Sequence, residues 1–201
     1  MSRIAVLDYG MGNLRSVAKA IERVGGRALV TADRDEAEAA DAVVVPGVGA
    51  FGACMRGLAD RGLDATVKDL LGSGRPLLGV CLGMQVLFDA SDEDPGPGLG
   101  RFHGRVRRLP DSVKVPHMGW NEVRWTREHP LAEGIPSGTM FYFVHSYAPD
   151  ADGDATVGVS EHGRPFAAAV ADGAVFATQF HPEKSGDAGL EIYRNLVRLA
   201  S

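Results

Sequence analysis

The side chains best suited to chemistry are a cysteine, a histidine and a glutamate in two short segments. Cys81 is the centre of a G-x-C-x-G pattern at residues 79–83, between an apolar run and a helical pattern. A sharp strand–turn–helix of this kind exposes a nucleophile, and its glycines let the chain pass closely. An isolated cysteine is more often a small buried residue, which is how we interpret Cys54. The context of Cys81 instead predicts a nucleophile, whose thiolate the following helix N-terminus would favour.

The second segment supplies a base and a group to orient it. His181 closes an apolar run at residues 174–180, and Glu183 lies two residues further on. A cysteine hydrolase needs a histidine within hydrogen-bond reach and a third group that holds the imidazole. Side chains at i and i+2 of an extended segment point the same way, and Pro182 disfavours a helix. Taken alone, His181 and Glu183 are typical of a strand end at the surface. In a chain that also contains Cys81 in its glycine-flanked turn, they predict a catalytic triad.

Backbone donors for an oxyanion are expected after a third apolar run, at residues 42–45. The segment 46–51 reads PGVGAF, and its glycines leave N–H groups free at the end of a strand. Amide hydrolysis needs such donors while negative charge builds on the carbonyl oxygen. A plain strand-to-helix turn explains the motif equally well. The candidate donors are Gly47, Val48, Gly49 and Leu82, the residue after the nucleophile.

The first half of the chain alternates strand and helix patterns. Apolar runs predict strands at residues 3–8, 28–31, 42–45 and 76–80, and helical spacing predicts helices at 13–24, 51–71 and 82–90. Continuous apolar strands separated by helices indicate a parallel sheet covered on both faces. Ligands of such sheets bind at the carboxyl ends of the strands, where Cys81 would lie.

The pattern changes after residue 91. A loop at 92–100 precedes strand-like runs at 105–109, 140–148, 155–160, 166–170 and 174–180, separated by Asp-Gly and His-Gly turns, and a last helix is expected at 188–200. We expect one domain, residues 1–201, with a doubly wound, mixed but mostly parallel sheet and helices on both faces. Its last strand would return beside the nucleophile strand.

Composition narrows the class of protein. The 201 residues carry a net charge of -5, are 45% hydrophobic and include two cysteines, which argues against disorder and a disulfide scaffold. No apolar stretch suits a leader or a membrane span, so we expect a cytoplasmic protein. The densest basic cluster, Arg105, Arg107 and Arg108, is too short for a nucleic-acid surface, so we expect no nucleic acid and no membrane as partners.

Two further patterns lead to no cofactor. The six histidines are scattered without metal-ligand spacing, so no metal is expected. Gly10-Met11-Gly12 begins a dinucleotide-binding pattern, but Arg15 stands where its third glycine should be.

The motifs together resemble the class I glutamine amidotransferases, across nearly the whole chain. Segments 46–51, 79–85 and 181–183 carry that resemblance. Segments 8–14, 115–121 and 143–147, with Lys184, are similar to the glutaminase subunits of imidazole glycerol phosphate synthase, and PHMGWN at 116–121 is the most specific of them. We find no departure at these positions.

The resemblance implies a flavodoxin-like fold, no cofactor, and a mechanism. Cys81 would attack the side-chain amide of glutamine, His181 would move the proton to ammonia, and Glu183 would orient His181. Ammonia would pass to a separate (βα)₈-barrel cyclase that makes imidazole glycerol phosphate and an aminoimidazole carboxamide nucleotide (AICAR) in histidine biosynthesis, and the lone subunit would be nearly inactive. The resemblance assigns the glutamine pocket to Gly49, Gln85, His145, Ser146 and Tyr147, and the cyclase interface to Asn13, Met118, Trp120, Asn121 and Lys184.

Three other functions fit parts of the pattern. Another glutaminase subunit of the same fold, such as one serving pyridoxal phosphate synthesis, would share the triad but lack PHMGWN. A stand-alone cysteine hydrolase, such as a γ-glutamyl peptidase, would act without a partner. A non-catalytic regulatory domain would have no need of an intact triad. These alternatives can be separated by testing whether glutaminase activity appears in the chain alone, only with a barrel cyclase, or under neither condition.

Overall fold

A nine-stranded sheet runs through the molecule in a computed structural model that describes residues 1–201. Its parallel part contains, in spatial order, β2 (Arg27–Thr31), β1 (Arg3–Leu7), β3 (Ala42–Gly47), β4 (Leu77–Cys81) and β12 (Val175–Thr178). Its antiparallel part continues with β11 (Pro165–Asp172), β10 (Thr156–Glu161), β7 (His117–Trp125) and β8 (Thr139–His145). The last strand of the chain, β12, therefore lies beside the nucleophile strand β4, as predicted.

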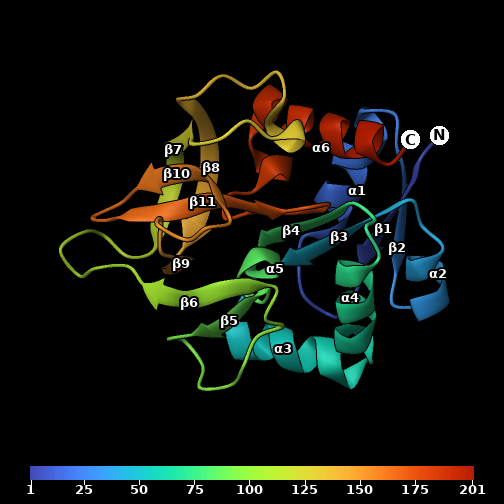
Figure 1. The fold of residues 1–201 in the computed structure, drawn as a ribbon, viewed down its shortest axis with the longest axis horizontal. Coiled ribbons are helices and arrows are strands. Elements are labelled where there is room, and N and C mark those ends of the chain that lie inside the picture. The colour runs from blue at the N-terminus through green and yellow to red at the C-terminus, as the bar shows by residue number, and fades with distance from the viewer.

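Helices cover both faces of the parallel part (Figure 1). One face carries α1 (Leu14–Arg23) and α6 (Gly186–Leu199), which pack on each other. The other carries α2 (Arg34–Glu38), α3 (Phe51–Asp60) and α4 (Leu63–Gly72), with the single turn α5 (Leu82–Gln85) following β4. Two 3₁₀ turns, η1 (Pro130–Ala132) and η2 (Pro182–Lys184), complete the helical elements. The predicted α/β class, with a mixed sheet between helical layers, is confirmed.

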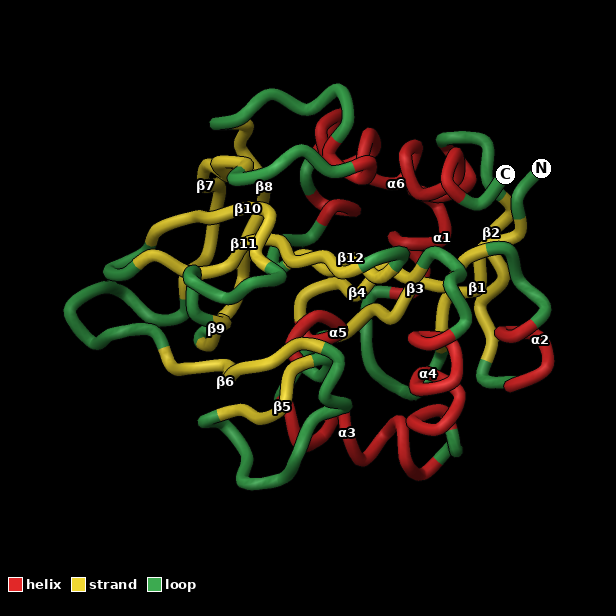
Figure 2. The backbone as a smooth tube through the Cα atoms, viewed as in Figure 1, coloured by secondary structure: helices red, strands yellow, loops and turns green.

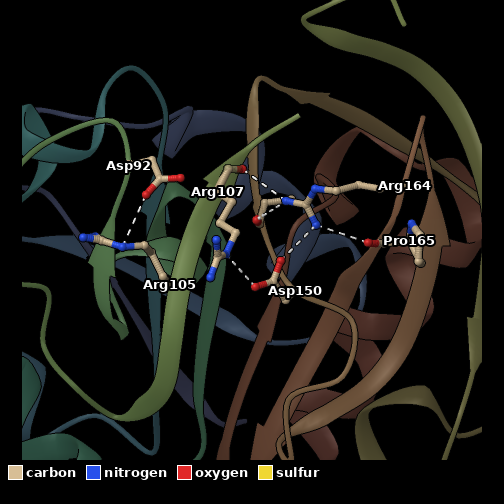
Figure 3. A network of polar contacts seen from close by, with 7 residues as sticks. Asp92, Arg105, Arg107, Asp150, Arg164 and Pro165 are labelled. Atoms are coloured by element: carbon tan, nitrogen blue, oxygen red, sulfur yellow. Dashed lines mark hydrogen bonds and ion pairs between the residues drawn. The ribbon is translucent and has the colours of Figure 1, made fainter. Parts of the chain in front are cut away.

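A second, three-stranded sheet consists of β5 (Phe88–Ser91), β6 (Phe102–Arg108) and β9 (Tyr147–Pro149), and lies below the antiparallel strands in Figure 2. Ion pairs join it to its neighbours (Figure 3). Asp150 accepts from Arg107 at 2.8 Å and from Arg164 at 3.3 Å, and Arg164 also donates to the Ala148 carbonyl at 2.9 Å. Arg105 pairs with Asp92 at 3.3 Å, so carboxylates occupy much of the basic cluster.

Two predicted elements were wrong, for tertiary reasons. The helix expected at 82–90 ends at Gln85, because the carbonyls of Val86 and Leu87 accept from Leu99 and Phe102 instead of from the next helical turn. The single strand expected at 140–148 divides at Ser146 into β8 and β9, which belong to different sheets. The strand β7 and the short helix α2 were not predicted at all.

One cluster of 52 buried apolar residues spans the parallel and antiparallel parts. The strands β3 and β4 are buried at every position, which agrees with their continuous apolar sequences. No helix has the length and apolar character needed to cross a membrane.

Candidate active site

The turn between β4 and α5 holds Cys81 in a strained backbone conformation. Its φ of 55° and ψ of -109° make it the only non-glycine residue with a positive φ. Glycine is required on either side because backbone atoms approach closely. A Cβ on Gly83 would lie 1.8 Å from the Val45 carbonyl oxygen, and one on Gly79 would lie 2.6 Å from the Gly83 oxygen. The sequence pattern around Cys81 is therefore a geometric necessity of the turn.

His181 and Glu183 meet directly after β12, the strand beside β4. The Nδ1 atom of His181 and the Oε1 atom of Glu183 are 2.8 Å apart, and the two side chains are 1% and 2% exposed. The extended geometry expected for this segment is wrong, because Pro182 occupies the first position of the 3₁₀ turn η2, where its fixed φ fits. Ser185 ends that turn and donates from Oγ to the His181 carbonyl at 2.6 Å.

The charges of the site favour a protonated imidazole. Burial by itself lowers the pKa of His181, but the hydrogen bonds and charges of Cys81 and Glu183 outweigh it and raise the pKa to about 10. Because Glu183 engages Nδ1, the ring nitrogen left for Cys81 is Nε2, which is buried and makes no hydrogen bond within the chain. The arrangement suits an imidazolium next to a thiolate, with a carboxylate behind it.

Cys81 and His181 open into a cavity of about 240 Å³. Seven of the positions predicted for the oxyanion site and the glutamine pocket line it: Val48, Gly49, Leu82, Gln85, His145, Ser146 and Tyr147. Gly47 does not line it. Gly47 is the buried last residue of β3, opposite Cys81 in register, and a Cβ there would lie 2.6 Å from the Leu82 Cβ.

Free backbone donors border the cavity. The N–H groups of Val48, Gly49 and Ala50 donate to no backbone or side-chain acceptor in the chain. Gly49 has a φ of +106°, a conformation that side chains rarely adopt, so this turn depends on glycine. The segment is thus a loop of unpaired donors next to the sulfur, as an oxyanion site requires.

The sequence analysis missed three cavity residues: Glu93, Pro116 and Val144. Glu93 is the only carboxylate among the lining residues, and its Oε2 accepts from the Phe51 N–H at 2.8 Å. The segment around it contains charged residues, prolines and glycines, so it was assigned only as a loop. No local pattern shows that the loop folds back over the start of α3.

His145 lies in a chain of hydrogen bonds whose direction is fixed at one end. Its Nδ1 is 2.8 Å from the Tyr147 carbonyl oxygen, which only accepts, so Nδ1 carries the proton. Its Nε2 accepts from His117 Nδ1 at 2.9 Å, and His117 Nε2 accepts from Asn121 Nδ2 at 3.2 Å. Burial lowers the pKa of His145 to about 3 and that of His117 to about 4, so both rings are neutral at physiological pH.

Apolar side chains project from the β7–β8 hairpin. Met118 and Trp120 are 63% and 54% exposed, and Met140 on β8 is 47% exposed. The Nζ atom of Lys184 lies 5.9 Å from the centre of the Tyr142 ring, and that ring packs edge-on against Trp120. Exposed methionine and tryptophan gathered in this way are typical of a protein–protein interface. We call Met118, Trp120 and Met140 the hairpin patch.

Two other interface candidates differ from the hairpin patch. Asn13 is half-buried before α1 and makes no side-chain capping bond. The side chain of Asn121 points to the opposite side of β7 from that of Trp120, because successive side chains of a strand alternate between its two faces. Its amide donates to His117 and to the Glu161 carbonyl, and its Oδ1 accepts from the Glu122 N–H, so its polar groups are used within the chain.

Known proteins are similar to this chain in sequence and in fold. The glutamine amidotransferase class-I family matches residues 5–199. The imidazole glycerol phosphate synthase subunit HisH of Bacillus cereus (strain G9842) is 48% identical over 193 residues, 96% of this chain and 92% of that protein. HisH of Aromatoleum aromaticum (strain DSM 19018 / LMG 30748 / EbN1) is 51% identical over 213 aligned residues that cover 100% of both.

A solved structure agrees in fold. The crystal structure of a glutamine amidotransferase superposes with a TM-score of 0.77 over 98% of both chains, at 22% identity. Together with the family match and the relatives of about half-identical sequence, this settles the family. The chain belongs to the class I glutamine amidotransferases, among the HisH subunits of imidazole glycerol phosphate synthase.

Proposed function

We propose that Cys81, His181 and Glu183 hydrolyse glutamine and that the ammonia is delivered to a (βα)₈-barrel cyclase. The observation that carries the proposal is the strained Cys81 on the floor of a cavity, next to a buried histidine that a carboxylate holds at 2.8 Å. A structural cysteine needs neither a strained backbone nor a charged neighbour, whereas a nucleophile uses both.

The first half of the reaction forms a thioester. The Cys81 thiolate attacks the carbon of the glutamine side-chain amide, and negative charge moves to the amide oxygen. The free N–H groups of Val48 and Gly49, with that of Leu82, stabilise this charge. The His181 imidazolium then gives its proton to the amide nitrogen, the carbon–nitrogen bond breaks, and ammonia leaves.

The second half releases glutamate. Neutral His181 takes a proton from a water molecule, and the water oxygen attacks the thioester carbon. The tetrahedral intermediate expels the Cys81 thiolate, which restores the starting pair with the His181 imidazolium. Glu183 accepts the hydrogen bond from Nδ1 and so keeps the proton there, which leaves Nε2 as the atom that exchanges protons.

The cavity suits a free amino acid. Its volume of about 240 Å³ equals the volume that roughly eight water molecules occupy in liquid water. We assign the Glu93 carboxylate to the α-ammonium group of glutamine, because it is the only acidic lining residue. Gln85, His145, Ser146 and Tyr147 also line the cavity, and the Tyr147 carbonyl accepts hydrogen bonds from Gln85 and His145.

The partner surface includes the hairpin patch, Lys184 and Asn13. The patch is apolar, and two of its residues, Met118 and Trp120, belong to β7, whose buried side contacts the cavity wall through His117. The relatives are subunits of imidazole glycerol phosphate synthase, so the partner of this chain would be a cyclase that uses ammonia to make imidazole glycerol phosphate and AICAR in histidine biosynthesis, in the cytoplasm. We expect low glutaminase activity without that partner.

The test is release of glutamate from glutamine, with and without a cognate barrel cyclase and its nucleotide ligand. Strong stimulation by the partner, abolished by Cys81→Ala, is the expected result. Equal activity without the partner would favour a stand-alone hydrolase and remove the interface assignments. Activity that survives Cys81→Ala would refute the assignment of the nucleophile.

A further inference from the structure

A buried glutamine contacts the sulfur of Cys81. Gln179 follows β12, is 0% exposed, and places its Nε2 atom 3.6 Å from Cys81 Sγ. Its backbone N–H is separately satisfied by the Ala168 carbonyl at 2.8 Å. The side-chain amide is therefore not needed to complete the sheet, and its contact with the reacting atom calls for an explanation of its own.

The orientation of this amide follows from neighbouring hydrogen bonds. The Tyr147 carbonyl oxygen can only accept, so the Gln85 atom 2.9 Å from it must be the donor Nε2. The same Nε2 lies 2.9 Å from the Gln179 amide, which must therefore present its oxygen there. The other end of the Gln179 amide, its NH₂ group, is then directed at the sulfur.

We propose that Gln179 is a further catalytic residue of this site, donating a hydrogen bond from Nε2 to the Cys81 sulfur and favouring the thiolate. The inference rests on the proposed role of Cys81 as nucleophile. A donor bonded to the charged form of an acid stabilises that form. Gln179 is a neutral donor and exchanges no proton, so it still faces the sulfur after His181 has given its proton to ammonia. The sulfur thus has a charged neighbour, His181, and a neutral donor, Gln179.

The experiment measures alkylation of Cys81 by iodoacetamide against pH, in the full-length chain, with the modified peptide identified by mass spectrometry. Cys54 will not interfere, because burial raises the pKa of its thiol to about 12. In Gln179→Met, which keeps the side-chain length but removes the donor, the midpoint of the profile should move to higher pH by roughly one to two units. Below the midpoint the alkylation rate should fall by about tenfold or more. Should this variant not fold, Gln179→Asn withdraws the donor from the sulfur and should shift the midpoint in the same direction.

Asn195→Leu is the matched control. Asn195 is another buried amide, and it donates to the Leu131 and Glu133 carbonyls at 2.9 and 2.8 Å, neither of which lines the cavity at Cys81. Both substitutions remove a buried amide and should lower the melting temperature, but only those at Gln179 should shift the alkylation profile.

The outcomes separate two failures. A wild-type alkylation profile in a folded Gln179 variant would overturn the inference while leaving Cys81 as the nucleophile. Glutaminase activity that survives Cys81→Ala would instead overturn the proposed function. A shift in both the Gln179 and the Asn195 variants would show that a general loosening of the fold, and not the donor, moves the profile.

Discussion

The strained backbone at Cys81 predicts that glycine at this position makes the protein more stable than alanine does. A φ of 55° with a ψ of -109° is accessible to glycine but disfavoured for residues with a Cβ. Cys81→Ala keeps the Cβ and the strain, whereas Cys81→Gly removes both. Since both variants lack the nucleophile and are inactive, the comparison measures stability alone.

The magnitude follows from two opposing terms. Relief of a strained conformation contributes about 1–3 kcal/mol to the folded state. The greater freedom of glycine in the unfolded chain costs about 0.5–1 kcal/mol. The net expectation is that the free energy of unfolding of Cys81→Gly exceeds that of Cys81→Ala by about 0–2.5 kcal/mol, with a central value of about 1 kcal/mol. For a chain of this size a difference of about 1 kcal/mol raises the melting temperature by about 2–4 °C.

Urea unfolding monitored by circular dichroism tests this expectation, with Cys54 as the internal control. Cys54 is buried within α3, where glycine is the less favourable residue. Cys54→Gly should therefore be less stable than Cys54→Ala, by about 1 kcal/mol. A Cys81→Gly variant that is no more stable than Cys81→Ala would refute the claim that the turn stores strain.

Three further predictions concern the rest of the site. Glu183→Gln should lower kcat for glutamine hydrolysis by roughly a hundredfold or more, since the neutral amide cannot stabilise the imidazolium. Because the folded-state pKa of His181 is raised from 6.5 to about 10, its stabilising contribution is complete below pH 6.5 and is lost as the pH rises through 10. Glu183→Gln should therefore flatten the decline in free energy of unfolding over that range, and an unchanged decline would contradict the assigned charges. His117 has the opposite sign: its pKa falls from 6.5 to about 4, so stability is lost as the pH falls through this window, and His117→Phe should make that loss shallower in urea titrations. Trp120→Ala should change the unfolding free energy of the lone chain by less than about 0.5 kcal/mol. It should weaken binding to the cyclase at least about tenfold by calorimetry, and unchanged affinity would remove Trp120 from the interface.

The sequence was most informative where local geometry alone determines the residue type. The glycines around Cys81 could be interpreted from the chain because a strand–turn–helix of this sharpness excludes a Cβ at Gly79 and Gly83. The strands β3 and β4 were also predictable from the sequence, since they carry no charged or polar side chain and are buried at every position. The contact that excludes a Cβ at Gly79 comes from Gly83, four residues away, whereas the one at Gly83 comes from Val45 on the neighbouring strand β3, which the strand–turn–helix pattern implies without naming.

The sequence failed where distant segments decide the outcome. The apolar pattern of 82–90 suits a helix, yet residues 98–102 take its carbonyl groups and convert residues 88–91 into a strand. The same applies to the site. Glu93 and Gln179 reach the cavity or the sulfur only because the loop at 92–100 and the end of β12 fold against β4. No short sequence motif predicts such contacts between distant segments.

The Tyr147 carbonyl links the nucleophile to the strand that carries the hairpin patch. It accepts from Gln85, whose amide also orients Gln179 against the Cys81 sulfur. It accepts as well from His145, which is connected to β7 through His117. Contiguity of this kind is not coupling, since coupling requires that changes at one end alter the energetics at the other. A double-mutant cycle of Gln179→Met and His117→Phe on partner-stimulated glutaminase activity distinguishes the two. If the activity losses of the two single variants add in the double variant, the Tyr147 carbonyl merely accepts from two independent groups. If the losses do not add, β7 and the Cys81 sulfur are energetically coupled.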